Sequence, residues 1–148
     1  MAGDVGIRPC LGIQIRLIFP NHTTKTVLLG NVHIISGFTE TKTKQEYELS
    51  EMMQYIKQMV AYTRSDGWML FGDFNAPPLL VEQITKGKVT SPKFPTHMNQ
   101  KEYPLDFGVF SDASLMTAGS SNWYPGQSKS DHVLIKYEQI GGPTVTFI

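Results

Sequence analysis

The sequence has few features of a cross-linked, membrane-spanning or strongly charged protein. Cys10 is the only cysteine among 148 residues, which excludes an intrachain disulfide and a cysteine-rich zinc site. Lys plus Arg and Asp plus Glu both number 13, and this zero formal charge argues against nucleic-acid binding by bulk positive charge. The first residues show no basic segment followed by an apolar run, and no apolar run approaches membrane-spanning length, so we expect no signal peptide and no membrane insertion. With 41% apolar residues the chain has enough material for the core of one domain.

Two strands joined by a hairpin are expected near the start of the chain. Residues 11–19 place Leu, Ile, Ile and Leu at alternate positions, which is the period of a half-buried strand. A Pro-Asn-His turn at 20–22 follows. Residues 26–35 then predict a strand buried on both faces, because both alternating sets are mostly apolar. Asn31 and His33 lie in the same set, near the end of this strand.

A long amphipathic helix is expected next. Thr43 and Glu46 have the spacing of a capping box, in which each side chain bonds to the other residue's backbone amide. Gly67 stands where the chain leaves the helix. Between them, apolar residues recur at three- and four-residue steps and form one core-facing stripe: Leu49, Met52, Met53, Ile56, Met59 and Val60.

The rest of the chain continues the alternation of strand and helix. We expect strands at 68–71, 105–110 and 133–137, a short helix at 79–84, and a strand in the tail. Residues 86–103 are polar and rich in proline and lysine, which predicts a long surface loop, and 111–123 predict a weakly structured connection. The alternation indicates an α/β (α+β layered) domain.

Four short polar motifs fall at the ends of expected strands. They are Asn31-Val32-His33, Gly72-Asp73-Phe74-Asn75, Leu105-Asp106-Phe107 and Ser130-Asp131-His132. Each has an ordinary structural explanation: a single histidine on a strand is usually a core residue bonded to a backbone carbonyl, and Gly, Asp and Asn are common in turns. Together, however, they place histidines, aspartates and an asparagine where layered α/β sheets hold their functional sites.

This set of side chains suits hydrolysis of a phosphate ester. A neutral histidine can take a proton from water, and a carboxylate can orient that histidine. Acidic oxygens can hold Mg²⁺ or another divalent cation, which neutralises charge on the phosphate and the leaving oxygen. An asparagine amide and a protonated histidine can donate to the phosphate oxygens. The sequence shows no glycine-rich phosphate loop ending in Lys-Ser/Thr.

In their order and composition the four motifs resemble the endonuclease/exonuclease/phosphatase superfamily, which has the deoxyribonuclease I-like fold. Within it, the catalytic B subunits of cytolethal distending toxins are similar over nearly the whole chain. Residues 8–13, Arg-Pro-Cys-Leu-Gly-Ile, look like the Arg-Pro-x-x-Gly-Ile segment of those subunits. Two positions depart from the pattern: Phe107 stands where a tyrosine is common, and His132 is followed by Val133 rather than an aromatic residue and proline.

The resemblance implies a catalytic role for five residues. His132 resembles the general base that activates the attacking water, and Asp106 resembles the carboxylate that orients this base. His33 resembles the second catalytic histidine, which contacts the scissile phosphate. Asp73 and Asn75 resemble the pair that positions phosphate and water.

Binding roles follow from the same resemblance. Asp131 resembles a carboxylate of the Mg²⁺ site, Arg8 resembles a contact to DNA phosphate, and Asn75 also resembles a phosphate-binding residue. A local basic patch in the 86–103 loop would hold DNA backbone or an inositol headgroup, although such a loop is more often only soluble surface. Its lysines are Lys86, Lys88, Lys93 and Lys101.

The resemblance also implies that residues 1–148 form a single partial domain, the C-terminal half of a deoxyribonuclease I-like β-sandwich with flanking helices. In this family two similar halves each contribute a sheet. The metal-binding glutamate and the glutamate that orients the histidine at the place of His33 belong to the first half. We therefore expect the sheet face that would pack on the other half to be exposed and apolar.

The implied activity is that of a Mg²⁺-dependent endodeoxyribonuclease that nicks host DNA with water activated by histidine. The implied setting is a secreted toxin that acts in the host nucleus. Its expected partners are DNA, and either toxin delivery subunits or a missing N-terminal half. Two alternatives are a catalytically inactive homologue that serves as a binding or assembly module, and a phosphoinositide phosphatase with the same machinery.

Overall fold

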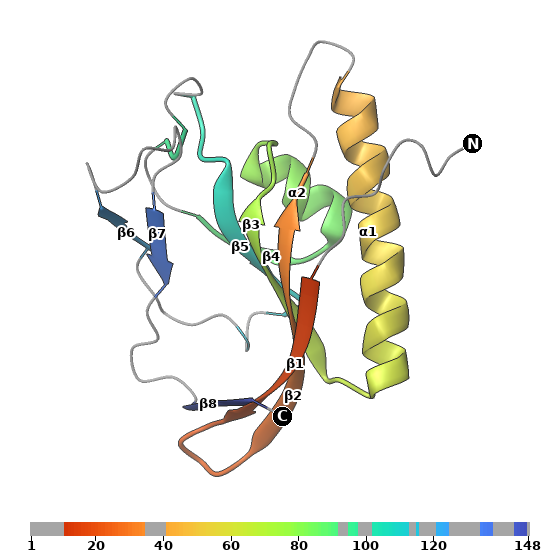
Figure 1. Cartoon of the computed structure of the whole chain (residues 1–148), viewed down its shortest axis with the longest axis vertical. Helices are drawn as coiled ribbons and strands as arrows, with labels where there is room; N and C mark the ends of the chain where they lie inside the picture. Colours follow the sequence, from red (N-terminus) through yellow and green to blue (C-terminus); the bar gives the residue numbers. More distant parts are fainter. Residues whose placement is uncertain are drawn as a thin grey trace.

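The computed structural model describes residues 11–34, 41–91, 95–97, 102–112, 115, 121–124, 134–137 and 144–147. The elements in chain order are β1 (Leu11–Ile18), β2 (Thr24–His33), α1 (Thr41–Thr63), β3 (Gly67–Asp73), α2 (Pro78–Thr85), β4 (Lys88–Thr90), β5 (Asp106–Phe110), β6 (Ser121–Tyr124), β7 (Leu134–Tyr137) and β8 (Thr144–Phe147). Six strands form one sheet in the order β4-β5-β3-β2-β1-β8, while β6 and β7 pair with each other (Figure 1). The pair β2–β3 is parallel and needs a crossover connection, which contains α1, whereas the other pairs are antiparallel.

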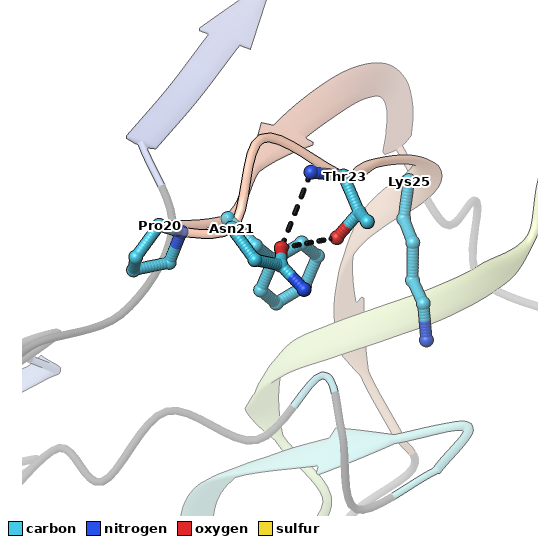
Figure 2. Close-up of a pocket in the computed structure, with 5 residues that line it drawn as sticks. Pro20, Asn21, Thr23 and Lys25 are labelled. Carbon is cyan, nitrogen blue, oxygen red and sulfur yellow. Dashed lines mark hydrogen bonds between the residues drawn. The ribbon is translucent and has the colours of Figure 1, made fainter.

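The hairpin between β1 and β2 confirms the expected turn. Phe19 N–H donates to Thr23 O at 2.9 Å, and His22 N–H donates to Phe19 O at 2.9 Å. Within the turn, Asn21 Oδ1 accepts hydrogen bonds from Thr23 N at 3.2 Å and from Thr23 Oγ1 at 2.6 Å (Figure 2). Because the ladder is paired up to Ile18 and Thr24, β2 begins two residues earlier than the apolar pattern predicts.

Helices α1 and α2 cover one face of the sheet, as the α1 stripe predicts. The core on this side joins the buried stripe of α1 to even-numbered residues of β2 and β3 and to odd-numbered residues of β5. Its buried members are Leu28, Val32, Ile34, Leu49, Met52, Met53, Ile56, Trp68, Leu70, Phe74, Ala76, Val81, Phe107 and Val109. Neither helix that the structure describes is both long and apolar enough to cross a membrane.

The two ends of α1 differ from the expected ones. The helix begins at Thr41, two residues before the threonine of the capping-box pattern, whose side chain lies outside the described residues. It ends at Thr63, and Arg64 takes the left-handed conformation with φ 54° while Ser65 N–H donates to Val60 O at 3.0 Å. Gly67 is therefore not the residue that ends the helix but the first residue of β3.

The opposite face of the sheet is only partly exposed. Its central part is a second apolar cluster, which corrects the expectation of an open face over the whole sheet. Leu115 joins this cluster from outside the sheet, and Phe110 joins it from β5. The buried members are Ile15, Leu17, Val27, Met69, Phe110 and Leu115. Toward the ends of β2 and β3 this face opens, and the Ile13 side chain is 45% exposed.

Residues 86–103 do not form the structureless loop that their composition predicts. Lys88–Thr90 is strand β4, which pairs with β5 at the edge of the sheet. Thr96 is fully buried. A polar side chain is tolerated there because its hydroxyl oxygen accepts two backbone N–H bonds, from Leu105 N at 2.9 Å and from Asp106 N at 3.0 Å. The connection expected over 111–123 likewise contains most of β6.

Candidate active site

The register of three neighbouring strands brings three predicted site residues into one row. His33 at the end of β2 pairs with Asp73 at the end of β3, and Asp73 pairs with Asp106 at the start of β5. Residues paired in register point to the same side of a sheet. The row lies on the face opposite the helices, because the neighbouring positions Val32 and Phe107 belong to the helix-side core.

The imidazole of His33 is not a core group. Its side chain is 60% exposed, and Nε2 lies 3.7 Å from Oδ2 of Asp73, whose side chain is 14% exposed. The alternative of a buried core histidine is therefore wrong, as is the expectation that this strand is buried on both faces along its whole length. The physical reason is that Asn31 and His33 lie where the face opens, beyond the cluster covered by Leu115.

Asp73 is held by hydrogen bonds from the turn that follows β3 and from the end of β2. Its Oδ1 accepts a hydrogen bond from Asn75 N at 2.9 Å. Its carbonyl oxygen accepts one from Ile34 N at 2.8 Å, which continues the β2–β3 pairing past His33. The carboxylate is thus fixed in position and carries a donor on one oxygen and an imidazole near the other.

Asp73 and Asp106 form a pair of carboxylates on adjacent antiparallel strands. Because Phe74 N donates to Leu105 O at 2.8 Å, the adjacent Asp73–Asp106 pair is a non-hydrogen-bonded pair, in which side chains approach most closely. Two like charges in such positions repel each other. Hydrogen-bond donors at this end of the sheet offset that repulsion, as the backbone amide of Asn75 does for Asp73.

Asn75 is fixed by hydrogen bonds of its backbone and of its side chain. It has φ 46°, a left-handed conformation that asparagine tolerates better than most residues. Nδ2 donates to Ile34 O at 2.7 Å, and this bond sets the orientation of the amide. No residue that the structure describes donates to Oδ1 of Asn75, so this oxygen can accept from water or a ligand.

The residues on both sides of Asp73 are closely packed. Phe74 is fully buried and stacks on Phe107 with 4.6 Å between ring centroids and 15° between ring planes. Gly72 has φ 147°, and a Cβ there would lie 2.1 Å from Val32 O. Gly72 and Asp73 belong to β3, so this motif begins within a strand and is not merely an ordinary turn.

The described residues do not form a metal centre on their own. The carboxylates of Asp73 and Asp106 have the oxygen chemistry that Mg²⁺ prefers. In the part of the chain that the structure describes, however, no group of three or more histidine, cysteine, aspartate or glutamate side chains is placed to hold a metal ion. The predicted metal ligand Asp131 lies outside this part, as do His132 and Arg8.

The described lysines of the 86–103 segment do not lie at this site. Lys86 and Lys88 are exposed, but Lys88 pairs with Phe110, at the end of β5 away from Asp106. Lys93 and Lys101 are outside the described residues.

Two hollows lie at opposite ends of the sheet. One of about 290 Å³ is lined by Ile13, Leu29, Gly30, Asn31 and Phe71, on the same face as the His33–Asp73–Asp106 row. The other, of about 390 Å³, lies at the β1–β2 turn and is lined by Phe19, Pro20, Asn21, Thr23 and Lys25 (Figure 2). Since the turn precedes β2 and His33 ends it, the larger hollow is remote from the predicted catalytic residues.

Two residues that support the site belong to none of the four motifs. Thr96 binds the amide of Asp106, and Gln45 of α1 donates from Nε2 to the carbonyl oxygen of Asn75. Gln45 leaves a sequence signal, because it stands one turn before Leu49 on the apolar stripe and would need a buried partner. Thr96 leaves none that distinguishes it from an ordinary loop threonine.

The mixed sheet with two helices on one face is the fold of about half a deoxyribonuclease I-like domain. Among solved structures, CdtB, the biologically active subunit of cytolethal distending toxin, matches with a TM-score of 0.50 and 17% identity over 85% of this chain and 56% of that chain. The Haemophilus ducreyi cytolethal distending toxin matches with a TM-score of 0.55 and 15% identity over 88% and 57%. Beta toxin from Staphylococcus aureus matches with a TM-score of 0.60 and 12% identity over 86% and 57%.

These similarities confirm, at the level of the fold, the resemblance that the four motifs indicate. The chain spans a little over half the length of each of these structures. No protein-family model and no curated protein sequence matches it.

Proposed function

We propose that the chain supplies half of the active site of a metal-dependent phosphodiesterase that nicks DNA. The observation that carries this proposal is the row of His33, Asp73 and Asp106 on the open face of the sheet. A fixed carboxylate beside an exposed imidazole, with a second carboxylate on the adjacent strand, suits phosphate-ester hydrolysis, and the fold is shared with the toxins named above.

Each group in the row has a distinct task in this proposal. The exposed imidazole of His33 donates to an oxygen of the scissile phosphate, and its Nε2 lies 3.7 Å from Asp73 Oδ2. Asp106 orients His132, which takes the proton of the attacking water. Asn75 Oδ1 accepts a hydrogen bond from that water, and Arg8 contacts the DNA backbone. Metal dependence and the role of Asp131 rest on the resemblance, by which the carboxylate of Asp131 would hold Mg²⁺.

Nicking of supercoiled plasmid tests the proposal. The chain is assayed alone and in a mixture with a second polypeptide. That polypeptide is the part of the cytolethal distending toxin catalytic subunit to which this chain has no counterpart. Each assay is run once with Mg²⁺ and once with EDTA. We expect Mg²⁺-dependent nicking that falls at least about a hundredfold in Asp106→Asn and in His132→Ala. The control is Gln54→Ala, a change at an exposed position of α1. If plasmid stays intact in every combination, the phosphodiesterase proposal is wrong.

Further assays identify the substrate and distinguish the proposed nuclease from the two alternative functions. Release of phosphate from a phosphoinositide, without nicking of plasmid, would show the phosphatase alternative. An inactive binding module would hydrolyse neither substrate, and the Asp106→Asn variant would then bind DNA no differently from the unchanged chain. Binding to DNA that weakens steeply as salt rises would support backbone recognition.

The open end of the sheet supports assembly with a second sheet. Ile13 is 45% exposed and lines an apolar hollow with Leu29 and Phe71. In this proposal a complementary half of the domain packs there and brings a metal-binding glutamate to the row. Ile13→Asp should abolish co-elution with that half while leaving circular dichroism unchanged, since a half-exposed residue tolerates charge. Undiminished co-elution would contradict this surface.

Delivery by partner subunits and action in the host nucleus are further parts of the proposal. They rest on the resemblance to the toxin subunits alone. Microscopy of the labelled protein added to cells, with and without the delivery subunits of a cytolethal distending toxin, tests them. Nuclear label that requires those subunits is the expected result.

A further inference from the structure

One buried polar side chain connects the helix layer to the predicted catalytic turn. Gln45 lies in the first part of α1 and is only 7% exposed. It stands one turn before Leu49, which is fully buried in the helix-side core. An amide in such a position costs free energy unless it is hydrogen-bonded. Gln45 meets this requirement by donating from Nε2 to the carbonyl oxygen of Asn75.

The acceptor of this bond belongs to a residue in an uncommon conformation. At φ 46°, Asn75 turns its N–H toward Asp73 Oδ1, at 2.9 Å. Its side-chain amide reaches Ile34 O at 2.7 Å. The bond from Gln45 holds the carbonyl oxygen, which is the remaining polar group of the Asn75 backbone. The conformation is therefore held from β3, from the end of β2 and from α1.

We propose that Gln45 is a positioning residue that acts through Asn75, a role that rests on the proposed phosphodiesterase function of this turn. By holding the Asn75 carbonyl, Gln45 keeps the backbone left-handed and thereby keeps Oδ1 of Asn75 aimed at the attacking water. Gln45 and Asn75 are 30 residues apart, so this support comes from tertiary packing and adds to the local bond that Asn75 N donates to Asp73 Oδ1. Gln45 touches neither the water nor the phosphate.

The first test measures the position of Asn75 without relying on activity. In ¹H–¹⁵N spectra of the chain, Gln45→Met, which keeps the length of the side chain but removes the donor, should shift the backbone and side-chain amide resonances of Asn75. The amide of Ile56, a core residue of the same helix about three turns away, should keep its position. Gln54→Met changes an exposed glutamine of the same helix and should leave Asn75 unmoved. Unshifted Asn75 resonances in Gln45→Met would overturn the proposal.

The second test uses the assembled enzyme and separates positioning from folding. Gln45→Met should lower kcat between about tenfold and about a hundredfold with little change in KM, because a misaimed group loses transition-state stabilisation. In an Asn75→Gly background, which keeps φ accessible but lacks the amide, Gln45→Met should have no further effect. An equal loss in both backgrounds would overturn the proposal.

A folding defect and a failed function give different results. If Gln45→Met does not fold, Gln45→Leu, which also lacks the donor and is apolar, is measured by the same spectra and kinetics, with the same expected shift and loss. If the unchanged protein hydrolyses no substrate, the phosphodiesterase function is wrong and the catalytic role of Gln45 falls with it. The spectra then still show whether Gln45 sets the conformation of Asn75.

Discussion

Replacing Gly72 by alanine should disturb both the stability of the sheet and the position of Asp73. Gly72 pairs with Val32 in the parallel β2–β3 ladder and has φ 147°, a conformation that residues with a Cβ rarely adopt. An added Cβ would lie 2.1 Å from Val32 O and 3.0 Å from Val32 C. Both atoms belong to the backbone of the adjacent strand, so no side-chain rotation relieves the contact.

Two contributions set the size of this effect. Backbone strain at a glycine-specific conformation costs about 1–3 kcal/mol. Forcing an extra carbon into a packed region costs about 1–3 kcal/mol more. We therefore expect Gly72→Ala to lower the free energy of unfolding by about 2–6 kcal/mol, a large part of the roughly 5–15 kcal/mol that stabilises typical domains.

Equilibrium unfolding in urea measures this change, provided that the m-value stays constant. Gly12→Ala is the matched control, because Gly12 also lies in a strand but its added Cβ would meet Leu29 O only at 3.5 Å, an ordinary contact. The control should change stability by less than about 1 kcal/mol. Equal midpoints for the two variants would refute the steric argument and the assigned conformation of Gly72.

Three further predictions concern groups that support the site or the hairpin. Phe74→Ala should lower stability by about 3–5 kcal/mol, because it empties a fully buried ring position; a loss below about 1 kcal/mol in urea unfolding would contradict the packing. Thr96→Val should cost about 1–3 kcal/mol and speed hydrogen exchange at the amides of Leu105 and Asp106, which lose their acceptor; unchanged exchange at these amides would argue against it. Asn21→Ala should lower the thermal midpoint slightly, by about 0.5–1 kcal/mol of stability, since it removes the acceptor for Thr23 at an exposed turn; an unchanged midpoint would show that the turn does not depend on that oxygen.

The succession of strands and helices follows from local patterns and is largely confirmed. Alternation predicts β1, and three- and four-residue spacing predicts the apolar face of α1. These patterns predict the elements because the period of a helix or strand determines which side chains share a face. The ends of elements are less predictable, since they depend on pairing: β2 is extended by its hairpin ladder, and α1 ends at Arg64 and not near Gly67.

The sequence by itself determined which residue types are available for chemistry, and their order along the chain identified the fold. Only the tertiary structure decided that His33, Asp73 and Asp106 stand in one row, because register between strands depends on pairing across the sheet. It also decided that His33 is exposed, that Leu115 covers part of the second face, and that Gln45 reaches Asn75. These are contacts between segments far apart in the chain, and the spacing of residues within one segment does not predict them.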